Sequence, residues 1–298
     1  MQHPRDILLG AQAAAGVLPV CDHYSGVEPR MRKSLQLQAE MSQEFGACVF
    51  DVTLDCEDGA PVGGEADHAA LVVSLLLAAA PGARVAARVH PIDHPAFEAD
   101  IATIVGQAGH QLSHLMIPKV ESAADVQRVV KALADVGSAA AAALPLHVLI
   151  ESPLAVHNAF EIAGQPRVQS LSFGLMDFVS SHNGAVPAEA MGSSGQFSHP
   201  LVLRASREFG YTRMWSIHPS QIRPILAALA PQADELAFAA ELMVAADRAQ
   251  WAPISFQGKL HDRASYRYFW QLLERGHQTG AILPEAVQGY FLRHAVAG

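Results

Sequence analysis

The feature that most constrains the fold is a pattern that recurs along the chain. A short apolar, β-branched run ends in polar residues and is followed by a stretch compatible with a helix. Seven such runs occur, namely GVLPVCDHY, ACVFDVTLDCED, RVAARVHP, HLMIPKVES, LHVLIES, VQSLSFGLMDF and RMWSIHPSQ. Helices are predicted between them, for example over residues 67–80, 123–134 and 155–163. Strands and helices in alternation predict an α/β fold with a parallel sheet covered on both faces.

Two folds satisfy this alternation, an open doubly wound sheet and a closed TIM (β/α)8 barrel. Barrel active sites are assembled from the carboxyl ends of many strands, whereas a doubly wound sheet concentrates its site at one switch point. No phosphate-binding GxGxxG or GxxxxGK[ST] motif follows any of the runs. Polar or charged residues instead end nearly every run: Asp22 and His23, Glu57 and Asp58, Arg88 and His90, Lys119 and Glu121, Glu151, Asp177, and His218. We therefore predict the barrel.

The strand count is one short of the eight that close such a barrel. The gap lies between FSHPLVLRA and SREFGYTRMW, so either the βα unit near 200–209 is short or a segment is missing. After IHPSQI the chain becomes strongly helical over 224–251, with a break at Pro231, and then continues as a short extended piece and another helix. We predict a barrel over 1–223 and a C-terminal helical extension or lid over 224–298.

Charge and cysteine usage exclude several classes of protein. A formal net charge of -9 and a pI near 5.9 argue against nucleic acid as a partner, because binding to phosphates needs a basic face. The three cysteines, Cys21, Cys48 and Cys56, show neither zinc-site spacing nor a disulfide framework, which is typical of a cytoplasmic protein. Asp6 and Gln12 interrupt the apolar N-terminal stretch, so neither a signal peptide nor a membrane span is predicted.

Glu151 and Asp177 each follow an apolar strand by one step. Two carboxylates from adjacent strands are a hard-oxygen set suited to Mg²⁺, with water and substrate completing the octahedron. The alternative is that each carboxylate caps the helix that follows it. The occurrence of both residues at equivalent positions favours the metal site.

Arg88 lies in a strand that is expected to be buried, where a guanidinium needs an anion. It is either a structural partner of Glu57 or Asp58, or a fork for a substrate carboxylate or oxyanion. Lys119 is a candidate Schiff-base lysine, but Glu121 points to the same side, and an ion pair between the two is favoured.

The remaining candidates are acidic side chains and histidines near strand ends. In VTLDCEDG, three acidic residues fall within four positions, so a cation or hydrogen-bond donors are expected to compensate them. Asp55 alternates away from Cys56 and is interpreted as structural. His23, His90 and His218 are candidate acids or bases. The chain has no HExxH or GxSxG motif, which argues against those metalloprotease and serine hydrolase classes.

Seven of these stretches together resemble the HpcH/HpaI aldolase/citrate lyase family, which includes citrate lyase beta-subunit-like and malyl-CoA lyase-like proteins. In chain order they are LDCEDGA, ARVHP, MIPKVES, VLIESPLAVHNAFEIA, SFGLMD, SIHPSQI and FQGKLHD. The resemblance covers most of residues 18–264. An ordered series of this kind is far more specific than any single motif.

The resemblance implies the barrel fold, Mg²⁺ as cofactor, and carbon–carbon lyase activity. The substrate class would be a 3-hydroxyacyl-CoA thioester of the malyl-, citramalyl- or citryl-CoA type, cleaved to or formed from acetyl-CoA and a 2-oxo acid. The oxo acid would be one such as glyoxylate, pyruvate or oxaloacetate. A homo-oligomer, trimer or hexamer, is also implied.

The resemblance also implies roles for individual residues. Glu151 and Asp177 match the family's metal ligands, and Arg88 matches the arginine that grips the 2-oxo acid and its oxyanion. Glu57 and Asp58 match an acidic pair that is hydrogen-bonded to metal-bound waters.

The last two motifs extend these assignments. Asp262, at the end of GKLHD, matches an aspartate that in several members reaches a neighbouring subunit's site and handles the proton at the acetyl carbon. Ile217, His218 and Pro219 lie near where the family places CoA.

The chain departs from the family pattern at several positions. LPVCDHYSG replaces an LFVPG-type opening, His90 stands where the family commonly has Asn, and Arg263 follows GKLHD. The family's seventh strand, with an IDxP-like sequence, is not visible. The substrate therefore stays open, and so do three alternatives: a malyl-CoA thioesterase-like hydrolase, a CoA-independent 4-hydroxy-2-oxo acid aldolase, and a non-catalytic family member.

Overall fold

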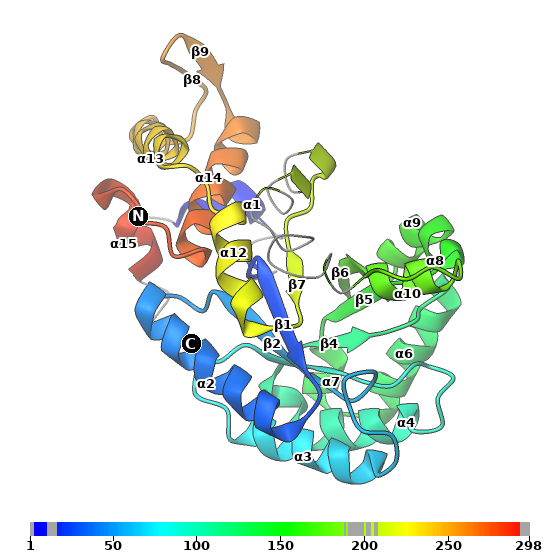
Figure 1. Cartoon of the computed structure of the whole chain (residues 1–298). Helices are drawn as coiled ribbons and strands as arrows, with labels where there is room; N and C mark the ends of the chain where they lie inside the picture. The colour runs from blue at the N-terminus through cyan, green and yellow to red at the C-terminus, as the bar shows by residue number, and fades with distance from the viewer. Residues whose placement is uncertain are drawn as a thin grey trace.

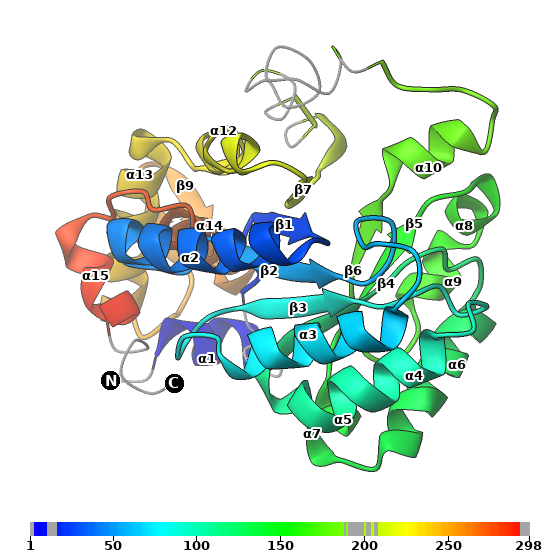
Figure 2. The same cartoon turned by 60° about the horizontal axis from the view of Figure 1, so that its bottom comes forward.

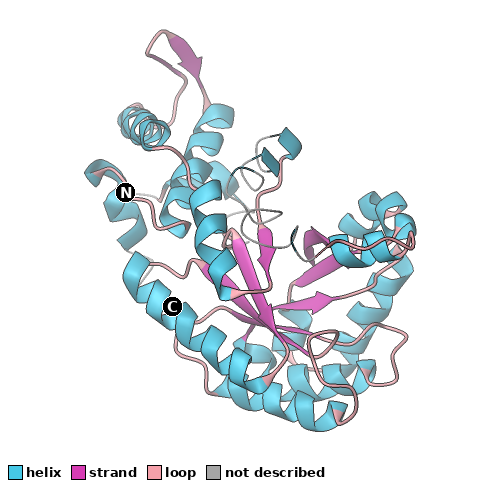
Figure 3. Ribbon diagram, in the orientation of Figure 1, coloured by secondary structure: helices cyan, strands magenta, loops and turns pink. Residues whose placement is uncertain are grey.

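The computed structural model describes residues 3–10, 17–187, 189, 200, 204–205 and 208–292. In this part of the chain seven parallel strands form one sheet in the order β6-β5-β4-β3-β2-β1-β7. The sheet curves into a nearly closed barrel with β6 and β7 at its two edges (Figures 1 and 3). The strands are β1 (Cys21–Ser25), β2 (Phe50–Asp55), β3 (Val85–Arg88), β4 (Leu112–Ile117), β5 (Leu146–Ile150), β6 (Val168–Phe173) and β7 (Met214–Ser216).

The seven predicted strands and the TIM-like α/β fold are confirmed. Every residue of β2, β3 and β5 is buried, as expected for strands covered on both faces. Every strand pair in this sheet is parallel, and in the β2–β3 pair Asp55 lies directly opposite Arg88. This register brings the polar ends of neighbouring strands to the same end of the barrel.

Helices cover the outer face of the sheet from β1 to β6 (Figure 2). Their bounds are α2 (Glu28–Phe45), α3 (Glu65–Leu77), α4 (Phe97–Asp100), η2 (Ile101–Val105), α5 (Gly106–Ala108), η3 (Gly109–Gln111), α6 (Ala123–Val136), α7 (Ala139–Ala143), α8 (Pro153–His157), α9 (Ala159–Ala163) and α10 (Leu175–Ser180). The helix predicted over 155–163 is two short helices, with a break at Asn158.

Helix α6 shows how the sequence sets these bounds. Ser122 and Asp125 form a reciprocal capping box at its start, and Gly137 ends it in the left-handed conformation. Val126, Val129 and Leu133 recur at helical spacing and are buried against the barrel. Because α6 follows β4 in the chain, its N-cap Ser122 lies at the end of the barrel that holds the carboxyl ends of the strands.

The C-terminal part forms a second hydrophobic cluster, built mainly from α13 (Ala233–Arg248), α14 (Arg263–Gln278) and α15 (Glu285–Leu292). Its largest fully buried side chains are Trp270 and Tyr266. The N-terminal helix α1 (Pro4–Leu9) packs on this cluster through Leu8, which the sequence did not indicate. A hairpin of β8 (Ile254–Phe256) and β9 (Lys259–His261) projects beyond these helices (Figure 1).

The predicted helix break near Pro231 is confirmed, because α12 (Pro219–Leu229) ends before it and α13 begins after it. Ile222 and Ile225 of α12 belong to the barrel cluster rather than to the C-terminal one. The boundary between 223 and 224 stays a prediction. The region near 200–209 lies largely outside the described residues, so the short unit expected there is untested. Among the helices in the described ranges, none is long and apolar enough to cross a membrane.

Candidate active site

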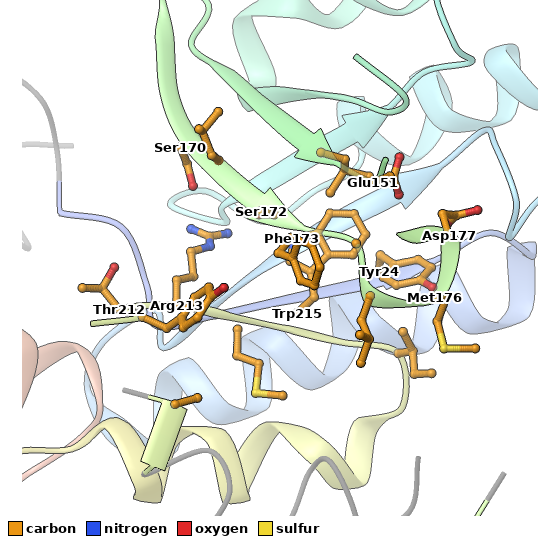
Figure 4. A pocket seen from close by; sticks show the side chains of 18 of the residues that line it. Tyr24, Glu151, Ser170, Ser172, Phe173, Met176, Asp177, Thr212, Arg213 and Trp215 are labelled. Carbon is orange, nitrogen blue, oxygen red and sulfur yellow. The ribbon is translucent and has the colours of Figure 1, made fainter. Parts of the chain in front are cut away.

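A cavity of about 980 Å³ opens between the β6 and β7 edges of the barrel, and strands β1, β3, β5, β6 and β7 all contribute to its lining. In Figure 4, Glu151 and Asp177 lie toward one end and Thr212 and Arg213 toward the other, with the aromatic rings between them. Among the described residues, the charged side chains that line the cavity are those of Asp58, Arg88, Glu151, Asp177, Arg204 and Arg213. Four of these six residues were singled out from the sequence.

Arg88 is buried and bound on several sides. Its Nε and Nη2 donate to Oδ1 and Oδ2 of Asp55, both at 2.6 Å, and its Nη1 lies 3.0 Å from Oε2 of Glu57. Although burial lowers the pKa of Arg88, the hydrogen bonds and charge of Asp55 raise it by more, so the guanidinium stays charged. Of the alternatives left open for Arg88, the pairing with Glu57 is present. The interpretation of Asp55 as structural agrees with its bidentate bond to Arg88.

Asp55 is itself fixed by the loop that follows β2. The backbone N–H groups of Glu57 and Gly59 donate to its Oδ1 and Oδ2 at 3.0 and 2.8 Å. Asp55 is fully buried, and these donors, with the Arg88 guanidinium, satisfy both carboxylate oxygens. The carboxylate thus locks the orientation of Arg88 and the path of the acidic loop together.

Lys119 is the second cation of this centre. Its Nζ donates to Oε1 of Glu57 and lies 3.6 Å from Oδ1 of Asp58. The predicted ion pair between Lys119 and Glu121 is wrong, because Glu121 instead accepts a hydrogen bond from Ser152 Oγ at 2.7 Å. Lys119 has a left-handed backbone with φ of 52°, so the chain turns at this residue and the simple strand alternation behind the prediction fails.

Glu151 is buried at the end of β5. Its Oε2 accepts a hydrogen bond from the backbone N–H of Lys119 at 2.9 Å. Burial, helped by the nearby charge of Asp177, raises the pKa of Glu151 to about 7. Neither carboxylate makes the alternative helix cap, since Ser152 caps α8 and no side chain caps α10. An anion that burial and a neighbouring carboxylate both disfavour is one that a cation would stabilise.

Gly174, which lies between β6 and α10, allows this arrangement because its backbone packs directly against the Glu151 carboxyl group. A Cβ at this position would lie 2.5 Å from Cγ and 2.6 Å from Oε1 of Glu151. Any larger residue at position 174 would displace the Glu151 carboxyl group. The close approach also holds the start of α10, and with it Asp177, beside the end of β5.

Charge at this centre is unbalanced. Five carboxylates, from Asp55, Glu57, Asp58, Glu151 and Asp177, share two cations, Arg88 and Lys119. Burial raises the pKa of Glu57 despite its contacts with both cations. The excess of negative charge next to a wide cavity is what a divalent cation would neutralise.

Two aromatic side chains pack on Arg88. Its guanidinium carbon lies 5.0 Å from the ring centre of Tyr24 on β1 and 5.6 Å from that of Trp215 on β7. The two rings are 4.8 Å apart, and both line the cavity. Neither was predicted, because a single aromatic residue in a strand reads as core packing. The one signal was that each belongs to a strand that ends in polar residues.

The other predicted residues lie elsewhere. Ile217 lines the cavity and is 43% exposed, whereas the His218 side chain caps α12 by accepting from Ser220 N, and Pro219 is the first residue of that helix. Asp262 is exposed and caps α14, where it accepts hydrogen bonds from Ala264 and Ser265. It does not line the cavity of its own chain.

Two of the candidate histidines have local partners. His23 Nδ1 lies 3.1 Å from Ser216 Oγ, and burial lowers its pKa. His90 Nδ1 lies 2.6 Å from Oδ2 of Asp100. Neither of them lines the cavity, and neither does His218. Their roles as an acid or base have no support from these contacts.

A second polar cluster, which we call the floor cluster, occupies the barrel interior at the amino ends of the strands. Arg213 Nη2 lies 2.8 Å from Oδ2 of Asp22 and 2.7 Å from Oδ2 of Asp51, and His114 and His147 lie beside Asp22. Asp22, His114 and His147 are the one group of three metal-ligating side chains found close together in the described ranges. The sequence indicated Asp22 only as a polar strand end.

The geometry of the floor cluster does not suit a metal ion. The rings of His114 and His147 are stacked, with centres 3.6 Å apart and planes 18° apart, so their in-plane lone pairs run side by side instead of converging. Asp22 already accepts from Thr53 and Arg213. We interpret the cluster as a structural network.

Comparison with known proteins identifies the family. The sequence profile of the HpcH/HpaI aldolase/citrate lyase family matches residues 35–214. An L-malyl-CoA/beta-methylmalyl-CoA lyase of Cereibacter sphaeroides is 27% identical over 277 residues, covering 76% of this chain and 87% of the relative. A citrate lyase subunit beta-like protein of Deinococcus radiodurans is 29% identical, covering 71% of this chain and 84% of its own.

Solved structures agree with these sequence matches. The crystal structure of a citrate lyase from Burkholderia xenovorans is 39% identical, with a TM-score of 0.69, and the match covers 97% of this chain and 99% of that one. The protein CitE of Mycobacterium tuberculosis, in complex with magnesium, acetoacetate and coenzyme A, has the same fold at 18% identity and a TM-score of 0.57, covering 87% and 98% of the two chains. The resemblance stated from the sequence motifs is confirmed, and the chain belongs to the HpcH/HpaI aldolase/citrate lyase family.

Proposed function

We propose that this protein is a Mg²⁺-dependent carbon–carbon lyase that cleaves or forms a 3-hydroxyacyl-CoA thioester, with acetyl-CoA and a 2-oxo acid as the other partners. The observation that carries the proposal is the meeting of Glu151 and Asp177 in one cavity, beside a buried and charged Arg88. Relatives named as malyl-CoA lyases support the CoA ester, and structures of M. tuberculosis CitE with magnesium support the metal.

The residues present fit a magnesium ion. Glu151 and Asp177 supply hard carboxylate oxygens, and burial beside Asp177 raises the pKa of Glu151, an environment that a cation would relieve. Bound there, Mg²⁺ would polarise the oxygens of the oxo-acid portion as a Lewis acid. Glu57 and Asp58 stand at the end of β2 and are proposed to hold metal-bound waters.

The chain's own residues account for the remaining demands of the reaction. In the cleavage direction the 3-hydroxyl group gives its proton to water, and its oxygen becomes the keto oxygen of the 2-oxo acid as the C2–C3 bond breaks. The electron pair of that bond passes to a thioester enolate, which must then be protonated at carbon. Arg88, held by Asp55 and Glu57, keeps N–H groups in a fixed direction for the developing oxyanion. Asp262 is the proposed proton donor, acting on a neighbouring subunit's site within a homo-oligomer.

The experiment is incubation of the purified protein with malyl-CoA, citramalyl-CoA and citryl-CoA in Mg²⁺, with the released oxo acid trapped and free thiol measured in parallel. We expect oxo acid and acetyl-CoA in equal amounts, and no reaction in the presence of chelator. Free CoA in step with a hydroxy acid would show a thioesterase instead. No product from any ester, with Mg²⁺ bound, would contradict the proposal.

A further inference from the structure

We infer that the 2-oxo acid taken by this site carries an apolar substituent rather than a second carboxylate. The inference rests on the proposed function and narrows its substrate class. The evidence is the chemistry of the side chains that line the cavity next to Arg88. The family assignment does not depend on these side chains.

The first observation is the composition of that wall. The lining residues contributed by β6, β7 and their neighbours are mostly apolar or aromatic: Leu171, Phe173, Leu175, Met176, Met214 and Trp215. Phe173 is 41% and Met176 is 47% exposed, so these side chains face open space. Figure 4 shows Phe173, Trp215 and Tyr24 in the part of the cavity near Glu151 and Asp177. An apolar wall of this kind gains free energy when an apolar substituent covers it.

The wall lies at the reaction centre and not at a distance from it. Tyr24 and Trp215 both pack on the Arg88 guanidinium, and the charge of Arg88 acts on Glu151. A 2-oxo acid bound between Arg88 and the carboxylate pair therefore directs its substituent toward the aromatic rings. The substituent would meet aromatic faces within a few bonds of the keto carbon.

The second observation is that every cation in the described lining of the cavity already faces at least one carboxylate. Arg88 faces Asp55 and Glu57, and Arg213 faces Asp22 and Asp51. The third, Arg204, bonds to Glu208 at 2.8 Å. Arg88 retains N–H groups for one substrate oxygen at the metal centre, but its positive charge is already shared by two carboxylates. Nε and Nη1 of Arg213 make no hydrogen bond to the described residues, but the charge of Arg213 is matched by two carboxylates. The described lining therefore offers a second carboxylate no positive charge that is not already shared.

Hydroxyl groups at the wall do not replace such a cation. Ser170, Ser172 and Thr212 line the cavity, and each can donate one hydrogen bond. A carboxylate that leaves water for a mostly apolar wall loses far more hydration than one or two neutral donors return. A dicarboxylic oxo acid such as oxaloacetate is therefore disfavoured at this site.

The test compares two oxo acids of nearly the same shape, oxaloacetate and 4-methyl-2-oxopentanoate, in which an isopropyl group replaces the second carboxylate. Each is condensed with acetyl-CoA in Mg²⁺, and binding of each is measured separately by calorimetry. We expect kcat/KM for the apolar acid to exceed that for oxaloacetate by about tenfold or more. Equal values, or a preference for oxaloacetate, would overturn the inference.

A charge-introducing variant tests the cause. Ser172→Lys places a free ammonium on the wall, so we expect the preference to shift toward oxaloacetate by at least about tenfold. The matched control is Ser74→Lys on the exposed face of α3, which should leave the ratio unchanged. An unchanged ratio in Ser172→Lys, with its melting temperature preserved, would contradict the proposed wall. If Ser172→Lys does not fold, the two-acid comparison on the unaltered protein decides alone.

The two proposals fail differently. If the protein binds the apolar acid more tightly but forms no carbon–carbon bond, the lyase proposal is wrong and the substrate class stands. If it turns over glyoxylate or oxaloacetate but neither binds nor uses the apolar acid, the lyase proposal stands and the substrate class is wrong.

Discussion

The barrel contains two polar clusters, and they differ in charge balance. At the carboxyl ends of the strands, five carboxylates share Arg88 and Lys119 beside a wide cavity. In the floor cluster, Arg213 pairs with both Asp22 and Asp51, and the neighbouring Arg84 also pairs with Asp51. Although burial raises the pKa of Asp22 and Asp51, Arg213 and the neighbouring donors and cations together lower both. Excess charge beside a wide cavity marks a ligand site, whereas charge that is balanced by direct ion pairs marks a structural network.

The largest expected effect is on catalysis at the first cluster. Glu151→Gln and Asp177→Asn should each lower kcat/KM by about 10³-fold, because each removes a proposed metal ligand. Glu121→Gln is the matched control, since Glu121 follows the neighbouring strand but bonds to Ser152 and does not line the cavity. It should retain activity within a few-fold. Full activity in Glu151→Gln would remove this cluster from the mechanism.

The next effect is on stability at the floor cluster. Arg213→Met should lower the free energy of unfolding by about 3–5 kcal/mol, because it leaves Asp22 and Asp51 buried with too little positive charge. Chemical denaturation measures this loss. Arg84→Met should cost less, since the Arg84 side chain is 30% exposed and pairs only with Asp51. Similar small losses in both variants would show that the network does not support the barrel.

The third effect is a pH dependence of the folding stability that comes from Glu151 in the first cluster. In the absence of metal, the pKa of Glu151 is about 7 in the folded protein, against an ordinary value of 4.5. The folded state therefore binds this proton more tightly, and its stabilising effect is present below pH 4.5 and lost as the pH rises through 7.

Glu151→Gln removes the loss of folding stability that accompanies ionisation of Glu151 at high pH. In chelator at pH 8 the variant should be more stable than the unaltered protein by up to about 3 kcal/mol, with the difference vanishing near pH 4.5. Mg²⁺ should then stabilise the unaltered protein but not the variant. Thermal melts across pH 4.5 to 8 test both statements, and a variant that is less stable at pH 8 would refute the assigned environment of Glu151.

The smallest effect concerns Asp262. Asp262→Ala should cost about 1 kcal/mol of stability because α14 loses its cap, while Asp262→Ser keeps a capping oxygen and should cost only a few tenths. If Asp262 also handles a proton, both variants lose activity alike. If Asp262→Ser instead retains activity and Asp262→Ala loses it in proportion to its loss of stability, the residue only caps α14.

The sequence was sufficient for the parts of this fold that follow from periodicity. The seven strands, the helix break at Pro231 and the carboxylates at strand ends all come from local patterns. It was not sufficient where the backbone leaves its regular path. The backbone turns in the left-handed conformation at Lys119, so this side chain pairs with Glu57 instead of Glu121. No sequence pattern predicts that turn.

Contacts between distant segments were also beyond the sequence. Asp55 faces Arg88 only because β2 and β3 pair in one register, and Arg213 joins Asp22 and Asp51 across 191 and 162 positions. The aromatic pair of Tyr24 and Trp215 has the same origin, since β1 and β7 become neighbours only when the barrel forms. Such contacts depend on the order of the strands in the sheet, and local sequence patterns do not predict that order.

The most direct test of the central claim is anomalous diffraction from crystals soaked in Mn²⁺, a substitute for Mg²⁺. We predict one strong peak within bonding distance of the carboxylates of Glu151 and Asp177, and none at the floor cluster. A peak among Asp22, His114 and His147, or no peak beside Glu151 at saturating Mn²⁺, would contradict the account.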